Sequence, residues 1–573
     1  MRLRIVAEPD FLRKTKQILI IPCRKVCLGL VAERQRRRSA SQNAQIWLVS
    51  KKEALVSTKL FTSIPHISRR DLLLAGATGA TLTSLSACTA PSSDAVNLSL
   101  AHGATGGGLK DTLDAHFPVT WPDISRVRQL YEPLLRFDSD YKIESSLAES
   151  VEPNDDGTEW TVRLRDGILF HDGRKVTSRD VEASMARMFD PDNPAPYGAD
   201  IAPIADLASS KVMDDRTYRL VLKEPYAIMD QLLANYTMTI VPADYDPEKP
   251  IGTGPFMAAE FTPGQRSLFK RFDDYWDQKA AYEELVIIDF ADDDAKVNAL
   301  LAGQIQTVDN LPTALVDSVK DQGINIMISE TGGWVPFTMR VDAAPFDDNR
   351  VRQAMRLICD RQQMIDQAFN GMGRVANDLY APFDPDYLGD ELPQRQQDID
   401  QAKALLKEAG QEGLQVELVT STAVGAGAVE AANLFAEQAK LAGVDVRLNK
   451  VDGSVFYGED YLSWVFAQDF WSTRLYLPQA AACALETSPY NETHWYDESY
   501  ADLVLTARRE VDKQKRRTLI QDAQKMEYEQ GGYIIWAFQN QVDAIASSVT
   551  GLEPSKEQPL SSFRFNRAKP ANA

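Results

Sequence analysis

Short stretches in which hydrophobic and polar residues alternate mark the chain between about residues 95 and 330. Trp160–Leu164 and Tyr218–Leu222 alternate with a period of two, which is typical of strands with one buried face. Between them, Thr177–Met185 has the pattern of a helix whose N-cap is its threonine. Asp293–Gly303 is a second expected helix, ended by its glycine. Strands and helices therefore alternate along this part of the chain.

From about residue 335 to 530 the hydrophobic positions follow helical spacing over longer stretches. Helices are predicted over three ranges, Asn349–Asn370, Gln401–Ala409 and Glu430–Leu441. The second and third are each followed by a strand-like hydrophobic run, Leu414–Val419 and Val444–Leu448. A last, highly charged helix is expected over Lys513–Gln530, and then a strand over Tyr533–Phe538. This alternation predicts an α/β fold.

The chain has 573 residues, too many for one ordinary domain, so two or more lobes are predicted. Its charge is distributed unevenly along the sequence. Residues 1–88 carry 16 Lys and Arg against 5 Asp and Glu, which leaves 46 against 77 in the remainder. The leader is thus basic and the rest is strongly acidic, which favours solubility. Because phosphate binding needs clustered Lys and Arg, nucleic acid is not expected as a partner.

The basic leader has the features of an export signal over residues 58–88. Arg69 and Arg70 come shortly before a mildly hydrophobic stretch rich in Ala, Gly, Thr and Leu. That stretch is shorter than the roughly 20 apolar residues of a spanning helix. The arginine pair resembles the twin-arginine (Tat) export pattern. Leu85–Cys88 then matches a lipobox, in which a small residue precedes a cysteine that becomes lipidated. We expect Cys88 to be the lipidated first residue of the mature chain.

Residues 1–57 lack steady periodicity and carry a run of arginines, Arg36–Arg38. Two interpretations stay open. One is an over-extended start, with the true initiator near Val56 or Leu60, and the other is a genuine long leader.

The sequence gives little support for metal or nucleophile chemistry. Beyond the leader only Cys359 and Cys483 remain of five cysteines, too few for a zinc site or a disulfide framework. Two buried thiols are expected, with a single bridge as the alternative. His171 lies between turn residues, and the Asp292–Asp294 run is interpreted as a helix N-terminus rather than a cation site. No cofactor and no resident metal are expected, and no nucleophile–base motif stands out.

A series of motifs occurs in a fixed order along the chain. They are Tyr131–Leu134, Leu147–Ser150, Asp156–Gly167, Phe170–Gly173, Gly252–Phe256, Asp274–Trp276, Ala299–Gly303, Phe346–Ala354 and Gln401–Gly410. In order and spacing these resemble the family 5 extracellular solute-binding proteins, the dipeptide, oligopeptide and nickel type of ABC-importer receptor. The resemblance covers almost all of residues 95–565.

The resemblance implies a two-lobed α/β clamp, similar to the type II periplasmic binding proteins, with a larger first lobe and a hinge. The first lobe is expected to hold residues 89–331 together with 540–573, and the second lobe residues 335–535. The chain would cross the hinge twice. Ligand is expected between the lobes, which close over it.

The resemblance also implies a ligand site within the aromatic-rich segment Tyr457–Trp495. In peptide-binding members this region supplies an aspartate for the ligand's amino terminus, and the match of Phe466–Phe470 implies Asp469 for that role. Members of the dipeptide type continue with a Tyr/Asn-x-Asp/Glu-Pro run, whereas Trp471–Arg474 follows here. Arg474 either clamps a ligand carboxylate in bidentate fashion or forms an internal salt bridge.

Aromatic and polar residues complete the expected site. Trp471 and Trp334 either stack on a planar or sugar ligand or are plain core aromatics. Asn491 and Trp495 are expected to line the same cleft.

The expected function is the substrate-binding component of an ABC importer, not an enzyme, which captures a short peptide or an amino-acid-derived compound. A receptor for an oligosaccharide, an opine or a metal chelate is the alternative, favoured by Trp471 and Arg474, and a secreted hydrolase is a remote one. The expected partners are the solute, the permease subunits and the membrane, reached through Cys88. The protein is expected to be an exported monomer on the periplasmic or cell-surface face, and a chemoreceptor partner would be compatible with this.

Overall fold

The computed structural model describes residues 99–118, 120–320 and 322–572. The expected export signal and Cys88 lie outside the described residues. Within the described ranges, none of the helices combines the length and the hydrophobicity that crossing a membrane requires.

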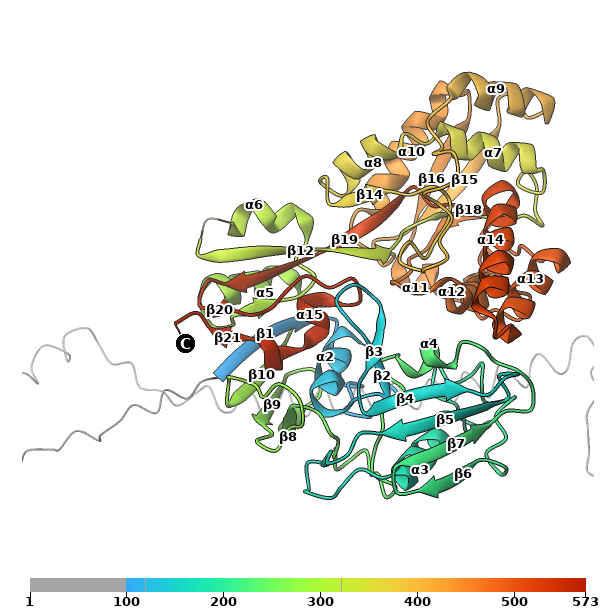
Figure 1. The fold of residues 1–573 in the computed structure, drawn as a ribbon. Helices are drawn as coiled ribbons and strands as arrows, with labels where there is room; N and C mark the ends of the chain where they lie inside the picture. Colours follow the sequence, from blue (N-terminus) through green and yellow to red (C-terminus); the bar gives the residue numbers. More distant parts are fainter. Residues whose placement is uncertain (1–98, 119, 321, 573) are drawn as a thin grey trace, which may run out of the picture. The chain divides into compact units, whose positions relative to one another are not determined.

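An eight-stranded mixed sheet joins strands from both ends of the described chain (Figure 1). Seven strands follow the order β12-β19-β11-β1-β10-β9-β8, and β14 pairs with β19 beside them. The bounds are β1 (Ser99–Thr105), β8 (Phe256–Thr262), β9 (Arg266–Arg271), β10 (Glu284–Phe290), β11 (Thr307–Val308), β12 (Ile324–Gly333), β14 (Gly373–Val375) and β19 (Ala537–Ala546). Because β19 pairs with both β11 and β12, the C-terminal part of the chain completes a sheet that begins with β1.

Short helices pack on this sheet and position loops at its edge. They are α2 (Trp121–Leu130), α5 (Asp293–Leu301), η1 (Thr313–Leu315), α6 (Val316–Val319), α15 (Pro559–Phe563) and η2 (Phe565–Arg567), with β20 (Val549–Thr550) and β21 (Lys569–Pro570) nearby. The side chain of Asp292 accepts the backbone N–H of Ala295 at 2.8 Å. This N-cap confirms that the Asp292–Asp294 run opens a helix.

An antiparallel sheet of four strands, in the order β4-β5-β7-β6, confirms the two predicted alternating strands. The elements of this region are β2 (Leu135–Phe137), β3 (Ile143–Ser145), β4 (Ala148–Pro153), β5 (Glu159–Leu164), α3 (Ser178–Met188), β6 (Lys211–Asp214), β7 (Thr217–Val221) and α4 (Met229–Leu233). In β5, Trp160, Val162 and Leu164 are buried while Thr161 and Arg163 are exposed. Thr177 is the N-cap of α3, as its sequence pattern predicts.

Residues between β13 and β18 form a region rich in helices. Its strands are β13 (Phe337–Met339), β15 (Gln415–Thr420), β16 (Asp445–Lys450), β17 (Phe466–Gln468) and β18 (Tyr533–Ile534). Its helices are α7 (Asn349–Ile358), α8 (Arg361–Ala368), α9 (Ile399–Glu408), α10 (Ala428–Leu441), α11 (Gly453–Phe456), α12 (Tyr476–Cys483), α13 (Glu498–Arg509) and α14 (Lys513–Gln530). The pair β15 and β16 is parallel, as expected when a helix connects two strands.

Two predicted elements are each divided in the structure. The helix expected over Asn349–Asn370 is broken between α7 and α8, because Asp360 caps a new helix by accepting the N–H of Gln363 at 3.0 Å. The strand expected over Tyr533–Phe538 is likewise divided between β18 and β19. There the N–H of Ile535 bonds the carboxylate of Asp378 at 2.9 Å instead of a neighbouring strand.

Gly252, Gly254 and His171 have structural roles. Gly252 and Gly254 pass so close to α2 that an added Cβ would lie 1.9 Å from the carbonyl oxygen of Leu130 and 2.2 Å from that of Gln129, respectively. His171 holds this turn through ring-nitrogen contacts of 3.2 Å to Gly252 N and 3.0 Å to Gly254 O. Burial lowers the pKa of His171 to about 4, so it stays neutral. In the described ranges, no group of three or more His, Cys, Asp or Glu is arranged to hold a metal ion.

Cys359 and Cys483 are both buried and unbridged, which confirms the expected thiols. Burial raises the pKa of Cys359 to about 12, so its thiol is protonated at neutral pH.

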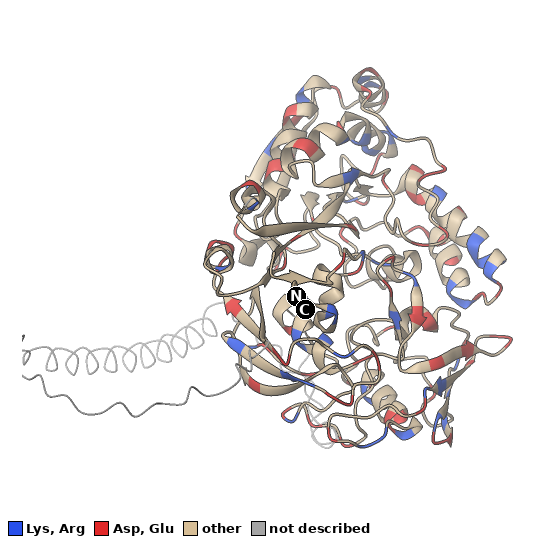
Figure 2. Ribbon diagram, turned by 60° about the vertical axis from the view of Figure 1, so that its left-hand side comes forward, with Lys and Arg blue, Asp and Glu red and all other residues tan. Residues whose placement is uncertain are grey.

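Charged residues of both signs are interspersed over the elements (Figure 2). Some charged groups are nevertheless buried, and ion pairs account for the burial of several of them. Arg361 and Arg395 both bind the fully buried carboxylate of Asp378, at 2.7 and 2.9 Å. Such pairing is the usual condition for placing a charge inside a protein.

Candidate functional site

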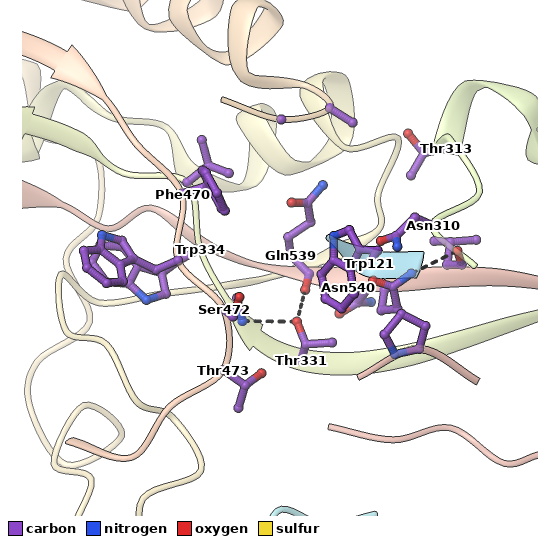
Figure 3. A pocket seen from close by; sticks show the side chains of 18 of the residues that line it. Trp121, Asn310, Thr313, Thr331, Trp334, Phe470, Ser472, Thr473, Gln539 and Asn540 are labelled. Atoms are coloured by element: carbon purple, nitrogen blue, oxygen red, sulfur yellow. Dashed lines mark hydrogen bonds between the residues drawn. The ribbon is translucent and has the colours of Figure 1, made fainter. Parts of the chain in front are cut away.

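A cavity of about 440 Å³ lies where the eight-stranded sheet meets the helix-rich region (Figure 3). Five chain segments supply most of its walls: residues 310–313, 331–335, 423–426, 470–473 and 539–542. Trp121, Asp293 and residues 557–559 complete the lining. The end of β12 and the middle of β19 lie side by side here, so two distant parts of the sequence share one wall.

Aromatic rings and carboxamides dominate the walls of this cavity, and Figure 3 shows several of them. The aromatic residues are Trp121, Trp334, Phe470 and Trp471, and the carboxamides are Asn310, Gln539, Asn540, Gln541 and Gln558. The two acidic residues of the lining are already paired, Asp293 with Lys296 at 3.0 Å and Glu557 with Arg128. The cavity therefore offers stacking faces and neutral hydrogen-bonding groups, which are the usual means of fixing a small polar ligand.

Trp334 and Trp471 come together although 136 positions separate them in the sequence. Each donates its backbone N–H to the carbonyl of the other at 2.9 Å. Their rings stack with centroids 5.9 Å apart and planes inclined by 19°. Both line the cavity, and whether they stack on a ligand stays a prediction. Trp334 also stacks on Tyr380 at 5.7 Å, so it belongs to the core as well. The indole N–H of Trp471 is buried and has no hydrogen-bond partner among the described residues.

Asp469 does not line the large cavity but lies directly beside its wall, and it is 3 % exposed. Its carboxylate accepts hydrogen bonds from the hydroxyl of Tyr461 at 2.9 Å and from that of Tyr457 at 3.4 Å. It lines a small cavity of about 10 Å³, room for a single water. Burial raises the pKa of Asp469 above its ordinary value, because no cation compensates the carboxylate.

Glu492 is the residue of this site that the sequence reasoning missed. It is 5 % exposed, lies beside Asp469 in the same small cavity, and accepts a hydrogen bond from the hydroxyl of Tyr533. Burial, and next the charge of Asp469, raise the pKa of Glu492 well above its ordinary value. The charge of Asp469 thus acts directly on Glu492, and one carboxyl oxygen of Glu492, Oε1, has no hydrogen-bond partner among the described residues. No pattern in the sequence pointed to Glu492, because it is one acid among many.

Arg474 lies at the other end of the 470–473 wall, outside the lining of the cavity. Its guanidinium is 5.1 Å from the ring centroid of Trp471 and 5.6 Å from that of Tyr197. Its Nε has no hydrogen-bond partner, and no carboxylate forms an ion pair with it among the described residues. The internal salt bridge, one of the two interpretations of this arginine, is therefore not formed.

Asn491 and Trp495 make local contacts and do not line the large cavity. The amide of Asn491 donates to the carbonyl oxygens of Leu485 at 3.2 Å and of Trp495 at 3.4 Å. The ring of Trp495 packs 4.5 Å from that of Tyr500. Their role in ligand binding stays a prediction.

The carboxamide side of the cavity was also missed. Gln539, Asn540 and Gln541 follow one another in β19, and three consecutive carboxamides in a strand are a recognisable signal. No signal in the sequence pointed to Trp121, because its position at the cavity depends on how α2 packs against the sheet.

Comparison with known proteins gives both close folds and related sequences. Di/tripeptide-binding protein 2 of Pseudomonas aeruginosa (strain UCBPP-PA14) is 28% identical over 74% of this chain and 86% of its own length. The structure of the periplasmic binding protein AgaA in complex with agropinic acid, from A. tumefaciens R10, is 25% identical with a TM-score of 0.68, covering 82% of this chain and 98% of that one.

The ABC transporter substrate-binding protein CtaP from Listeria monocytogenes has a TM-score of 0.75 at 21% identity, covering 82% of this chain and 99% of its own. This likeness in fold confirms the predicted class, a two-lobed α/β binding protein. The model of the bacterial extracellular solute-binding proteins, family 5, matches residues 142–482. That match spans more than half of the sequence, and the chain therefore belongs to the bacterial extracellular solute-binding proteins of family 5.

Proposed function

We propose that this protein captures an amino-acid-derived solute or a short peptide and delivers it to the permease of an ABC importer. The observation that carries the proposal is the 470–473 wall of the 440 Å³ cavity, which is flanked by opposite charges. Asp469 precedes the wall and Arg474 follows it, and neither has an ionic partner among the described residues. A ligand with both an ammonium and a carboxylate group would satisfy both.

Each charge has a distinct task in this proposal. The carboxylate of Asp469, which accepts hydrogen bonds from the hydroxyls of Tyr457 and Tyr461, receives the ligand's ammonium group. Arg474 presents a planar set of N–H donors to the ligand's carboxylate, a geometry that favours two parallel hydrogen bonds. Each residue would bind the oppositely charged ligand group more strongly in the closed protein, because an ion pair is stronger where water is excluded.

The clamp motion follows from the two strands that connect the regions. We propose that residues 89–331 with 540–573 move as one lobe and residues 335–535 as the other. The connections at the end of β12 and the start of β19 would then be the hinge. The cavity lies next to both connections, so a ligand that contacts both lobes stabilises the closed form.

An opine-like or oligosaccharide ligand is the second candidate. The four aromatic rings and five carboxamides of the cavity favour it, because flat rings stack on sugar-like faces and carboxamides bond hydroxyl groups. The likeness to AgaA, solved with agropinic acid, supports the same class.

Native mass spectrometry of the purified protein, looking for a co-purified ligand, separates the two candidates. Calorimetry with the identified compound then tests the charges. Asp469→Asn should weaken the binding of a ligand with a free amino group but not the binding of its N-acetyl form. Arg474→Gln should weaken the binding of a ligand with a free carboxylate but not the binding of its amide. Arg447→Gln, on an exposed arginine, is the matched control. Unchanged affinity of Asp469→Asn for every ligand found would remove this residue from the site.

We propose further that the protein is exported and anchored as a monomer through a lipid on Cys88, and that it is not an enzyme. Arg69, Arg70 and the Leu85–Cys88 motif support the export signal. Mass spectrometry of the mature protein should find a diacylglyceryl group on Cys88. Recovery of chemically altered ligand after incubation with the pure protein would contradict the non-enzymatic role.

A further inference from the structure

A second polar cavity, of about 150 Å³, lies apart from the solute cavity and shares none of its lining residues. Four arginines line it: Arg128, Arg136, Arg564 and Arg567. Its volume is well above the roughly 10–15 Å³ that a single water requires, so it has room for a group of several heavy atoms. The motifs of the family do not account for this concentration of positive charge.

Two of the four arginines form ion pairs with nearby carboxylates. Arg128 pairs with Glu557 and donates its Nε–H to the side-chain oxygen of Gln558 at 3.0 Å. Arg136 binds Glu144 at 2.7 Å and Asp277 at 3.3 Å. These pairs satisfy Arg128 and Arg136 on one side only.

The other two arginines lack such compensation. Arg564 donates to the backbone carbonyl of Phe137 and reaches the carboxylate of Glu144 only at 3.7 Å. Arg567 has no hydrogen-bond or ion-pair partner for its guanidinium among the described residues. Burial first, and then the neighbouring charges of Arg136, Arg128 and Arg567, lower the pKa of Arg564 to about 10. Arg564 therefore lies among other cations, with Glu557 acting in the opposite direction.

An unsatisfied hydroxyl lines the same cavity. Ser146 is fully buried and its Oγ has no hydrogen-bond partner within the described part of the chain. A buried hydroxyl without a partner is costly, and a bound acceptor would satisfy it.

Glu132, the buried acid of this cavity, does not oppose an anion strongly. Its carboxyl oxygens are engaged by three donors, Tyr275 at 2.8 Å, Trp276 at 2.8 Å and Thr253 at 2.9 Å. Burial raises the pKa of Glu132, while the hydrogen bonds from these three donors act in the opposite direction.

We infer that this second cavity binds a small inorganic oxyanion, phosphate or sulfate, between the guanidinium groups of Arg136, Arg564 and Arg567 and the hydroxyl of Ser146. Guanidinium groups match the oxygens of such anions in pairs, and several donors around one anion share its charge. The site is separate from the solute cavity, so it stands independently of the ligand proposed there.

Calorimetric titration of the purified full-length chain with sodium sulfate and with sodium phosphate, at ionic strength held constant with sodium chloride, tests the inference. Saturable binding of either anion is expected, and Arg567→Gln should weaken it about tenfold, the usual effect of losing a hydrogen bond to a charged group. Arg447→Gln, which removes an exposed arginine elsewhere, should leave it unchanged.

Ser146→Ala supplies a second variant whose folding is not in question, because it removes a buried hydroxyl that has no partner. It should raise the dissociation constant severalfold while the melting temperature stays equal or rises. The inference is overturned if neither anion binds saturably, or if Arg567→Gln weakens binding no more than Arg447→Gln does. If Arg567→Gln fails to fold, unchanged affinity of Ser146→Ala overturns it.

Discussion

Arg126 and Arg474 are two arginines with opposite surroundings, the first fully buried and the second half-buried. Arg126, in α2, is fully buried and binds three carboxylates, Asp111 at 2.9 Å, Asp123 at 3.4 Å and Asp289 at 2.5 Å. Its Nε–H is used as well, by the hydroxyl of Ser267 at 2.8 Å. Arg474 faces the rings of Trp471 and Tyr197 and has no carboxylate partner in the part of the chain that the structure describes.

The difference separates a charge that the fold compensates with carboxylates from one that no described carboxylate compensates. A guanidinium cannot lose its proton under ordinary conditions, so a buried arginine needs either an anion or a set of carbonyl oxygens, as Arg356 has in the backbone of Tyr528, Gly531 and Tyr533. The fold supplies carboxylates for Arg126, whereas for Arg474 we propose that the ligand supplies the anion. The aromatic faces near Arg474 stabilise the cation only in part.

Buried acids obey a different rule, because they can accept a proton. Glu527 is 2 % exposed and bonds the hydroxyl of Tyr476 at 3.2 Å. Burial raises its pKa from 4.5 to about 8, so the folded protein neutralises this acid instead of pairing it. An unpaired buried acid is therefore weaker evidence for a ligand than an unpaired buried arginine.

The largest expected effect concerns the compensated arginine. Arg126→Met should destabilise the fold by about 3–5 kcal/mol, because it leaves buried carboxylates without their cation. Urea unfolding measures this change, and Arg447→Gln should shift the unfolding free energy by less than about 1 kcal/mol. A loss below about 1 kcal/mol for Arg126→Met would mean that its pairing contributes little.

In contrast to Arg126→Met, Arg474→Gln should leave the free energy of unfolding nearly unchanged. We expect the affinity for a carboxylate-bearing ligand to fall by about 2 kcal/mol, or roughly thirtyfold, since a charged hydrogen bond is lost. Calorimetry and urea unfolding of the same preparation measure the two quantities. A strong loss of stability without loss of affinity would show that Arg474 is structural.

The buried acid gives a pH-dependent prediction. Because the folded pKa of Glu527 is raised, its contribution is fully present below the unfolded pKa of 4.5 and is lost as pH rises through about 8. Through this group the parent protein should lose up to about 1.4 kcal/mol of unfolding free energy per pH unit between pH 5 and 8. Glu527→Gln should abolish that loss. Urea unfolding across this range would refute the assignment if the variant and the parent lose stability in parallel.

The smallest expected effect is that of Trp471→Phe. The indole N–H has no partner among the described residues, so its loss should change stability by less than about 1 kcal/mol. Affinity for a ring-bearing or sugar-like ligand should fall by about 0.5–1.5 kcal/mol, the range of one aromatic contact. Equal affinity of both proteins would assign Trp471 to the core alone.

Local pattern was enough for much of the secondary structure. The helix Lys513–Gln530 has the same bounds in the structure as in its prediction, because periodicity, an N-cap and a following glycine pair all act within the segment. The break in Asn349–Asn370 was missed, because helical periodicity continues across Asp360 and the cap competes with it only locally.

The site was predictable only where the family motif or aromatic density pointed to it. Asp469, Trp471 and Arg474 stand together in the sequence, and the structure places Trp471 in the wall of the cavity and the two charged residues outside its lining. Glu492 and Ser146 gave no signal, since a lone acid or serine is common and only its surroundings are unusual.

The sequence by itself determined the α/β class, the position of most helices and the segment that walls the cavity, since all of these depend on neighbours along the chain. Only the tertiary structure decided which charges are compensated. Asp289 lies 163 positions from Arg126 and yet neutralises it, while no acid reaches Arg474 from any described part of the chain. Compensation of a charge depends on distance in space, and that distance is set by packing rather than by the order of residues.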